Sequence, residues 1–106
     1  MTQQEMFKLF EQIYARDIEK MKEKNEEYAR PENAFSNFEA MAYKNNCSKE
    51  EALYEQLSKH LAWLDDYRNK KFNLEIAKEH LGDIRIFCAI LQIMLNENFN
   101  LNNLED

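Results

Sequence analysis

The sequence predicts an all-α protein, and three observations support this prediction. The chain of 106 residues contains one glycine and one proline, whereas sheets and their tight turns use both residues repeatedly and long helices exclude them. Apolar residues recur at steps of three and four, which is the period of an amphipathic helix. A hydrophobic fraction of 44% with 32% charged residues is typical of a globular chain rather than a disordered one. We therefore expect a four-helix bundle-like single domain.

Capping residues mark the starts of the expected helices. Thr2, Ser36 and Ser48 are each followed three residues later by glutamate, which is the capping-box pattern. Asn73 is a fourth N-cap candidate, with Glu75 in the first turn, where a carboxylate meets the positive end of the helix dipole. These signals predict helices at residues 3–28, 37–46, 49–69 and 74–97, within one domain over residues 1–97. Residues 98–106 form an acidic, Asn-rich tail, whose apolar residues either fray with it or dock on a neighbouring subunit.

The apolar residues of each helix indicate the faces that meet in the core. In the first helix the stripe consists of Phe7, Phe10, Tyr14, Ile18 and Met21, and in the third of Leu53, Leu57, Leu61 and Leu64. The fourth helix has one apolar line of Ala77, Leu81, Ile84, Cys88, Leu91 and Leu95, with Ile76, Phe87, Ile90 and Met94 beside it. That helix is either the centre of the bundle or an oligomer seam. We expect a homo-oligomer with a site near the subunit boundary, although the length also permits a self-contained bundle.

Charge and cysteine content narrow the possible partners. With 20 acidic and 14 basic residues the formal net charge is -6, which argues against binding to duplex nucleic acid but leaves room for a small anion in a local basic pocket. Cys47 and Cys88 lack the spacing of a zinc site and read as free thiols in a reducing compartment. Because no leader or membrane-spanning segment is recognisable, we expect a cytoplasmic protein that does not bind a membrane.

Residues 24–38 are the least helix-like and most polar-aromatic part of the chain. Pro31 disfavours a helical conformation at Arg30, so the first helix should end near Tyr28. The loop offers a cation, aromatic rings and amides next to the N-terminus of a helix, which are the components of a nucleotide site. The candidate ligand-binding residues here are Lys24, Tyr28, Arg30, Phe35 and Asn37. Alternatively this is a polar crossover loop whose Phe35 and Phe38 plug the core.

Two further groups of polar residues lie on the third and fourth expected helices. His60 falls on the leucine line of the third helix, so it faces either the core or a cleft, and Lys59 beside it is placed to reach a phosphate. On the fourth helix, Glu79 and Asp83 are one turn apart and share a face, which allows them to hold Mg²⁺. Arg85 is a further candidate phosphate contact.

The run Glu79-His80-Leu81-Gly82-Asp83-Ile84 resembles the second metal-binding helix of the all-α nucleoside triphosphate pyrophosphatases of the MazG type. That family pairs an ExxD step on this helix with an EExxE step on an earlier one. In this chain His80 stands three residues before Asp83, and the third helix carries Glu51 and Glu55. The resemblance implies an Mg²⁺-dependent pyrophosphatase in which Glu79 and Asp83 bind the metal and Glu51 or Glu55 completes its ligands.

Across most of the chain, the layout also resembles small helical phage proteins linked to nucleotide modification and nucleotide binding. The residues that carry this resemblance are Lys24, Tyr28, Asn37, Phe38, Lys59 and Asp83. The resemblance implies a nucleotide ligand and, for a viral protein, a location in the host cytoplasm.

Three functions are consistent with these observations. The leading hypothesis is a nucleotide-binding protein that sequesters a small phosphorylated nucleotide without turnover or cofactor, as an anti-defence sponge would. Its candidate phosphate contacts are Lys24, Arg30, Lys59, His60 and Arg85, with Tyr28 or Phe35 as the stacking face. The alternatives are the Mg²⁺-dependent pyrophosphatase and a protein-protein interaction or inhibitor module whose acidic surface meets a basic partner.

Overall fold

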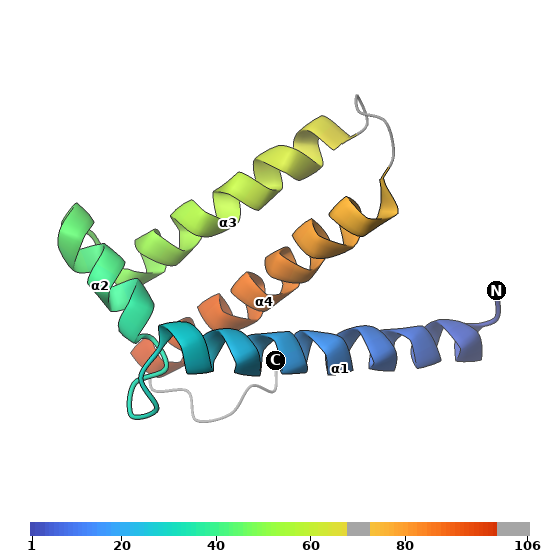
Figure 1. Cartoon of the computed structure of the whole chain (residues 1–106), viewed down its shortest axis with the longest axis horizontal. Helices are drawn as coiled ribbons and strands as arrows, with labels where there is room; N and C mark the ends of the chain where they lie inside the picture. Colours follow the sequence, from blue (N-terminus) through green and yellow to red (C-terminus); the bar gives the residue numbers. More distant parts are fainter. Residues whose placement is uncertain (68–72, 100–106) are drawn as a thin grey trace. The chain divides into compact units, whose positions relative to one another are not determined.

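The computed structural model describes residues 1–67 and 73–99, and these residues form four helices and no β-strand (Figure 1). The helices are α1 (Gln3–Tyr28), α2 (Ser36–Asn45), α3 (Lys49–Asp66) and α4 (Leu74–Asn98). The all-α prediction is confirmed. Helix α3 ends at Asp66 rather than at residue 69, and residues 68–69 lie outside the described part. Of the expected tail, residues 100–106 also lie outside it, whereas Asn98 belongs to the last turn of α4.

Three of the four expected N-caps are confirmed. The side-chain oxygens of Thr2, Ser48 and Asn73 accept hydrogen bonds from the backbone N–H groups of Glu5 (3.1 Å), Glu51 (3.1 Å) and Ile76 (3.2 Å). Each bond satisfies one of the backbone donors that the first turn of a helix leaves without an intrahelical partner. These caps explain why α1, α3 and α4 begin where local sequence predicts.

The expected cap at Ser36 is wrong. Ser36 is the first residue of α2 itself, and its hydroxyl oxygen accepts a hydrogen bond from the backbone N–H of Arg30 at 2.9 Å. The turn that begins at Pro31 brings the Arg30 amide close to this hydroxyl, and the loop thereby takes the oxygen that a capping box would use.

Helix α2 ends in a tight turn that leads directly into α3. Asn46 has a φ of 53°, in the left-handed region that asparagine tolerates better than most residues. The N–H of Cys47 then bonds the carbonyl of Ala42 (3.0 Å), and the N–H of Asn46 bonds that of Tyr43 (3.4 Å). This pair of bonds is a Schellman motif, and it sets the Ser48 cap immediately after α2.

The chain divides into two compact units, one of residues 1–37 and one beginning at Phe38. In the second unit, α3 and α4 lie side by side and run antiparallel (Figure 1). Leu53 and Met94 are fully buried there. The other buried hydrophobic residues of this unit are Phe38, Ala42, Ala52, Leu57, Ala77 and Ile86.

The buried face of α4 differs from the expected one by about one residue of rotation, roughly 100°. Ala77 and Met94 are buried as expected, and Ile86 and Asp83 from outside the expected set are buried as well. In contrast, Leu81, Leu95 and Cys88 of the expected line are exposed. The physical reason is that α4 is apolar around most of its circumference, so its own pattern does not choose a face. Packing against α3 makes that choice. Both cysteines are free thiols, as expected.

The apolar stripe of α1 exists, but the described residues do not bury it. No residue of α1 is buried, and Phe7, Phe10, Tyr14 and Ile18 are exposed. None of the helices within residues 1–67 and 73–99 is both long enough and apolar enough to cross a membrane.

Candidate functional site

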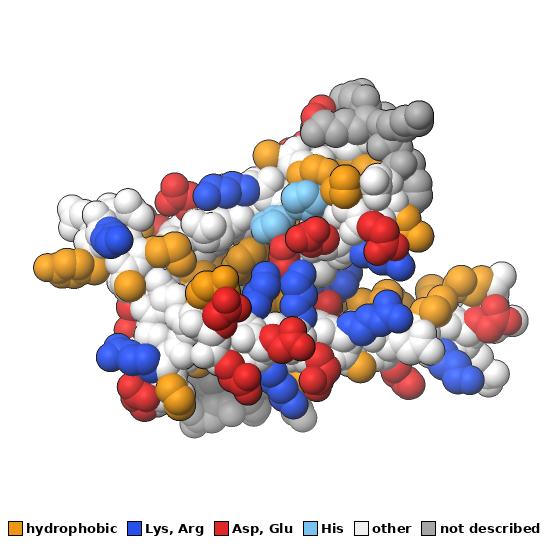
Figure 2. Space-filling model, in the orientation of Figure 1, with side chains coloured by type: hydrophobic (Ala, Val, Ile, Leu, Met, Phe, Trp, Pro, Cys, Tyr) orange, Lys and Arg blue, Asp and Glu red, His pale blue; other side chains and the backbone are white. Residues whose placement is uncertain are grey.

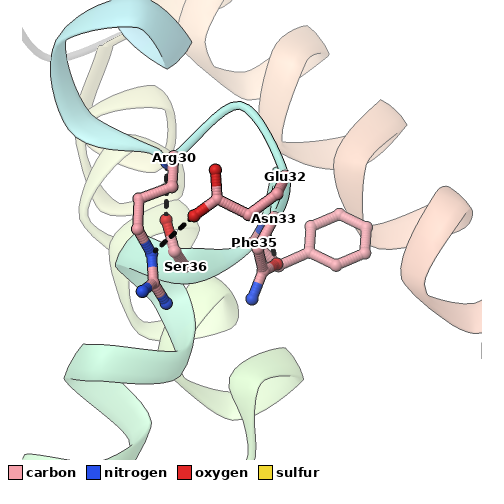
Figure 3. A network of polar contacts seen from close by, with 5 residues as sticks. All are labelled: Arg30, Glu32, Asn33, Phe35 and Ser36. Atoms are coloured by element: carbon pink, nitrogen blue, oxygen red, sulfur yellow. Dashed lines mark hydrogen bonds and ion pairs between the residues drawn. The ribbon is translucent and has the colours of Figure 1, made fainter.

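The loop between α1 and α2 is held in shape by its own hydrogen bonds (Figure 3). The N–H of Asn33 donates to the Arg30 carbonyl (3.0 Å), and the N–H of Arg30 donates to the Ser36 hydroxyl (2.9 Å). The N–H of Phe35 donates to the side-chain oxygen of Asn33 (3.0 Å). Helix α1 ends at Tyr28, as Pro31 predicts. The three hydrogen bonds then hold the backbone that follows, including the backbone of Arg30.

A cavity of about 420 Å³ lies where α1 runs into this loop. Its lining residues are Asn25, Glu26, Ala29, Arg30, Pro31 and Ala34. The volume is within the range of small-molecule sites. The lining combines an amide, a carboxylate and a guanidinium with small apolar side chains, so it offers hydrogen-bond donors, acceptors and one positive charge. We call it the loop pocket.

The guanidinium of Arg30 forms a weak ion pair whose partner can be replaced by another anion. Its Nε lies 3.8 Å from a carboxylate oxygen of Glu32, and the two side chains are 69% and 70% exposed. Ion pairs this exposed are weak, since water screens them. An anion with several oxygens that enters the loop pocket is able to replace Glu32 as the partner of Arg30.

The other residues predicted for this region do not converge on the loop pocket. The ring of Phe35 projects to the opposite side of the loop from the Arg30 guanidinium (Figure 3). Tyr28 is 61% exposed, and neither it nor Lys24 lines the pocket. The side-chain oxygen of Asn37 is buried and has no hydrogen-bond partner among the described residues. Asn25 was not predicted as a site residue. Its position one turn before the end of the helix was the feature of the sequence that could have identified it.

The second unit contains a cluster of rings and one carboxylate, which we call the histidine cluster. The Nδ1 atoms of His60 on α3 and His80 on α4 are 2.9 Å apart, and Nε2 of His60 is 3.6 Å from Oδ2 of Asp83. Trp63 stacks on His80, with ring centroids 4.4 Å apart. Phe87 lies 5.7 Å from His60. Both histidines lie together at the surface (Figure 2).

The geometry of the histidine cluster requires a definite arrangement of protons. A hydrogen bond between two Nδ1 atoms forms when one of them carries a proton and the other does not. Asp83 stands beside the opposite nitrogen of His60 and is buried, so it orients that ring. The hydrogen bond between the two Nδ1 atoms joins α3 to α4, and Asp83 lies 3.6 Å from the other nitrogen of His60.

The His60 ring is half-buried and hydrogen-bonded. The sequence predicted that it would face either the core or a cleft, and the observed burial lies between these two alternatives. Lys59 beside it is exposed and Arg85 is half-buried. His80 and Trp63 were not predicted as site residues. The signal for Trp63 was its spacing, because it lies three residues after His60 on one helix face, whereas no local pattern pairs these two residues of α3 with His80 of α4.

The carboxylates expected to bind Mg²⁺ are spread over different places. Asp83 is buried beside His60, whereas Glu79 is exposed. Glu51 and Glu55 line a separate cavity of about 610 Å³ with Leu91 and Leu95, because the antiparallel register sets them opposite the C-terminal half of α4. Among residues 1–67 and 73–99, no group of three or more His, Cys, Asp or Glu side chains is placed to hold a metal ion.

Glu50, at the rim of this second cavity, has a pKa below its ordinary value. Burial raises the pKa by opposing the charged form, but hydrogen bonds from Asn98, from its own backbone N–H and from Lys49 outweigh it. The Asn98 amide donates to Oε1 of Glu50 at 2.8 Å, and Nζ of Lys49 lies 3.1 Å from the same oxygen. These contacts join the start of α3 to the end of α4.

The fold and the two sites describe an all-α protein with a polar loop pocket in one unit and a histidine cluster in the other. In comparisons with known proteins, neither a family model nor a curated protein nor a solved structure matches this chain.

Proposed function

We propose that this protein binds a small phosphorylated nucleotide in the loop pocket and does not turn it over. The observation that carries the proposal is the meeting of Asn25, Glu26 and Arg30 in one cavity of about 420 Å³. These side chains supply the three kinds of polar group that a nucleotide requires, namely a cation for phosphate and both acceptors and donors for a base edge.

Each group in the loop pocket has a defined role in this proposal. Arg30 binds the phosphate, because its planar guanidinium matches phosphate oxygens in a bidentate geometry, and it exchanges Glu32 for them. The carboxylate of Glu26 accepts hydrogen bonds from an exocyclic amino group, and the amide of Asn25 both donates and accepts. Ala29, Pro31 and Ala34 form the apolar wall against which the base lies.

The hydrogen bonds of the loop support the same proposal. Since the backbone from Arg30 to Ser36 is already ordered by the Arg30–Ser36 and Asn33–Phe35 bonds, binding costs little of the entropy that ordering a loop would require. A rigid loop also presents the Arg30 side chain from a fixed point.

The test is thermal unfolding of the full chain against linear and cyclic nucleotides, with and without Mg²⁺, followed by titration calorimetry of the nucleotide that raises the midpoint most. A ligand that binds the folded state alone raises the midpoint by mass action. We expect Arg30→Ala to weaken binding by about tenfold or more, since a charge-assisted hydrogen bond contributes about 1.5–3 kcal/mol. Arg16→Ala is the matched control, because Arg16 is an exposed arginine of α1 outside the loop pocket.

Two results would contradict the proposal. The first is the absence of any midpoint shift with every nucleotide, or equal binding by Arg30→Ala and the wild-type chain. The second is recovery of the nucleotide in cleaved form after incubation with Mg²⁺, which would favour the pyrophosphatase alternative. The sponge role implied by the phage resemblance stays a prediction until a nucleotide is identified.

A further inference from the structure

Helix α1 presents a continuous apolar face that the described chain leaves exposed. Its large apolar residues are Met6, Phe7, Leu9, Phe10, Ile13, Tyr14 and Ile18, each between 36% and 55% exposed. The rings of Phe10 and Tyr14 stack on each other, with centroids 6.2 Å apart. Figure 2 shows hydrophobic side chains gathered along the N-terminal half of α1. Exposed apolar patches of this kind mark interaction surfaces.

The opposite side of α1 is polar, so the helix is amphipathic. At 100° per residue, the seven apolar residues occupy one half of the helix circumference over residues 6–18, with Asp17 as the one charged residue in that half, and Lys8, Gln12 and Glu19 lie on the other half. Helices in proteins derive most of their stability from packing such a face. A helix of 26 residues in which none is buried therefore requires a cover.

We propose that this cover is α1 of a second copy of the chain, paired antiparallel about a two-fold axis near Gln12. This inference is independent of the proposed nucleotide site. In this register Phe10 of one copy meets Tyr14 of the other, and Phe7 meets Ile18. The stripe is thus complementary to itself, which a two-fold interface requires. Phenylalanine and tyrosine are the residue types that carry much of the binding energy at protein interfaces.

Charge selects the antiparallel over the parallel arrangement. Glu5 and Lys20 lie on the same flank of the apolar face. Antiparallel pairing sets Glu5 of one copy beside Lys20 of the other, whereas parallel pairing turns the two copies of this flank to opposite sides of the contact and forms no such pair of opposite charges.

The size of the face also fits a second copy. The exposed surface of these seven residues is roughly 600 Å² per chain, so a pair of helices that covers all of it buries roughly 1,200 Å² in total, which is the lower end of the range for specific interfaces. The face is long and narrow, as the contact between two helices is.

The first experiment measures molar mass by light scattering after size-exclusion chromatography, over a range of concentrations. We expect the wild-type chain to be a dimer or a multiple of one, and Phe10→Asp to halve that mass. Gln12→Asp is the matched control, because it adds the same charge to the polar side of α1 and leaves the mass unchanged. A monomeric wild type at about 100 µM, or an unchanged mass for Phe10→Asp, overturns the proposal.

The second experiment tests the register and does not require a destabilising substitution. In a chain with Cys47→Ser and Cys88→Ser, we expect Ile13→Cys to form a covalent dimer with a short bismaleimide. Met6→Cys should not, because antiparallel pairing separates the two copies of residue 6 by roughly 20 Å along the axis. Equal cross-linking at both positions indicates parallel pairing and overturns the proposal, as does failure at residue 13.

Discussion

At the scale of single residues, the sequence identifies several side chains of the candidate sites but does not show which residues they contact. Pro31 alone predicts that α1 ends near Tyr28, and the structure confirms it. His60 on its leucine line predicts a ring that faces the core or a cleft, and the structure leaves it half-buried. The partner of that ring, His80, lies 20 residues away on another helix, and no local spacing identifies it. Ser36 illustrates the opposite case, since its local pattern predicts a cap and a bond to Arg30 takes its place.

Glu50 links stability to pH, and Asn98→Ala tests that link. The folded chain holds the pKa of Glu50 below the ordinary value of 4.5, so the stabilisation from its ionised form is present above that value and is lost as the pH falls through the lower folded-state pKa. We expect Asn98→Ala to lower the free energy of unfolding by about 1 kcal/mol at pH 7. Urea titrations should show the difference from wild type shrinking below pH 4.5.

Asn45→Ala is the control for this titration, because the side chain of Asn45 bonds a backbone carbonyl, that of Met41, and no carboxylate. Its effect on stability should not change between pH 3 and pH 7. If the effect of Asn98→Ala were equally large at both pH values, the hydrogen bond from Asn98 would not be a cause of the lowered pKa.

At the scale of helices, local sequence was sufficient to predict where most helices begin, but it was not sufficient to predict which face of a helix is buried. Thr2, Ser48 and Asn73 each accept a backbone hydrogen bond within three residues, so the interaction that begins the helix is contained in the local sequence. The buried face of α4 is not, because a helix that is apolar around most of its circumference fits its partner in several rotations. The metal-ligand prediction depended on that same rotation and on the register of α3 against α4.

The Ser48 cap gives a direct test at this scale. Ser48→Ala removes the oxygen that accepts from the Glu51 N–H, and we expect a loss of about 1 kcal/mol in the free energy of unfolding. Ser58→Ala is the matched control, since Ser58 lies within α3 and its hydroxyl donates to the carbonyl of Glu55. Equal losses in the two variants would show that the cap contributes nothing particular to α3.

At the scale of the whole molecule, the two units differ in how much they bury. Helices α3 and α4 enclose Leu53 and Met94 completely, whereas α1 buries none of its residues. Since local opening is governed by buried apolar contacts, the hairpin of α3 and α4 should be the most stable part of the chain. The stability of α1 should then depend on protein concentration.

Hydrogen exchange followed by mass spectrometry measures this difference. At low protein concentration we expect the amides of α1 to exchange well before those around Leu53 and Met94. Raising the concentration should slow exchange in α1 and leave α3 and α4 unchanged, because pairing through α1 protects that helix alone. Exchange in α1 that is as slow as in α3 at the lowest concentration would contradict this account.

The fold class, the number of helices, most of their bounds and the break before the loop could be predicted from local sequence. These features follow from caps, from the helical period and from proline, all of which act within a few residues. The tertiary structure alone decided which face of α4 is buried, that His60 meets His80, and that Asn25 joins Arg30 in the loop pocket. These outcomes depend on the rotation and register of one segment against another, which packing sets and local patterns do not encode.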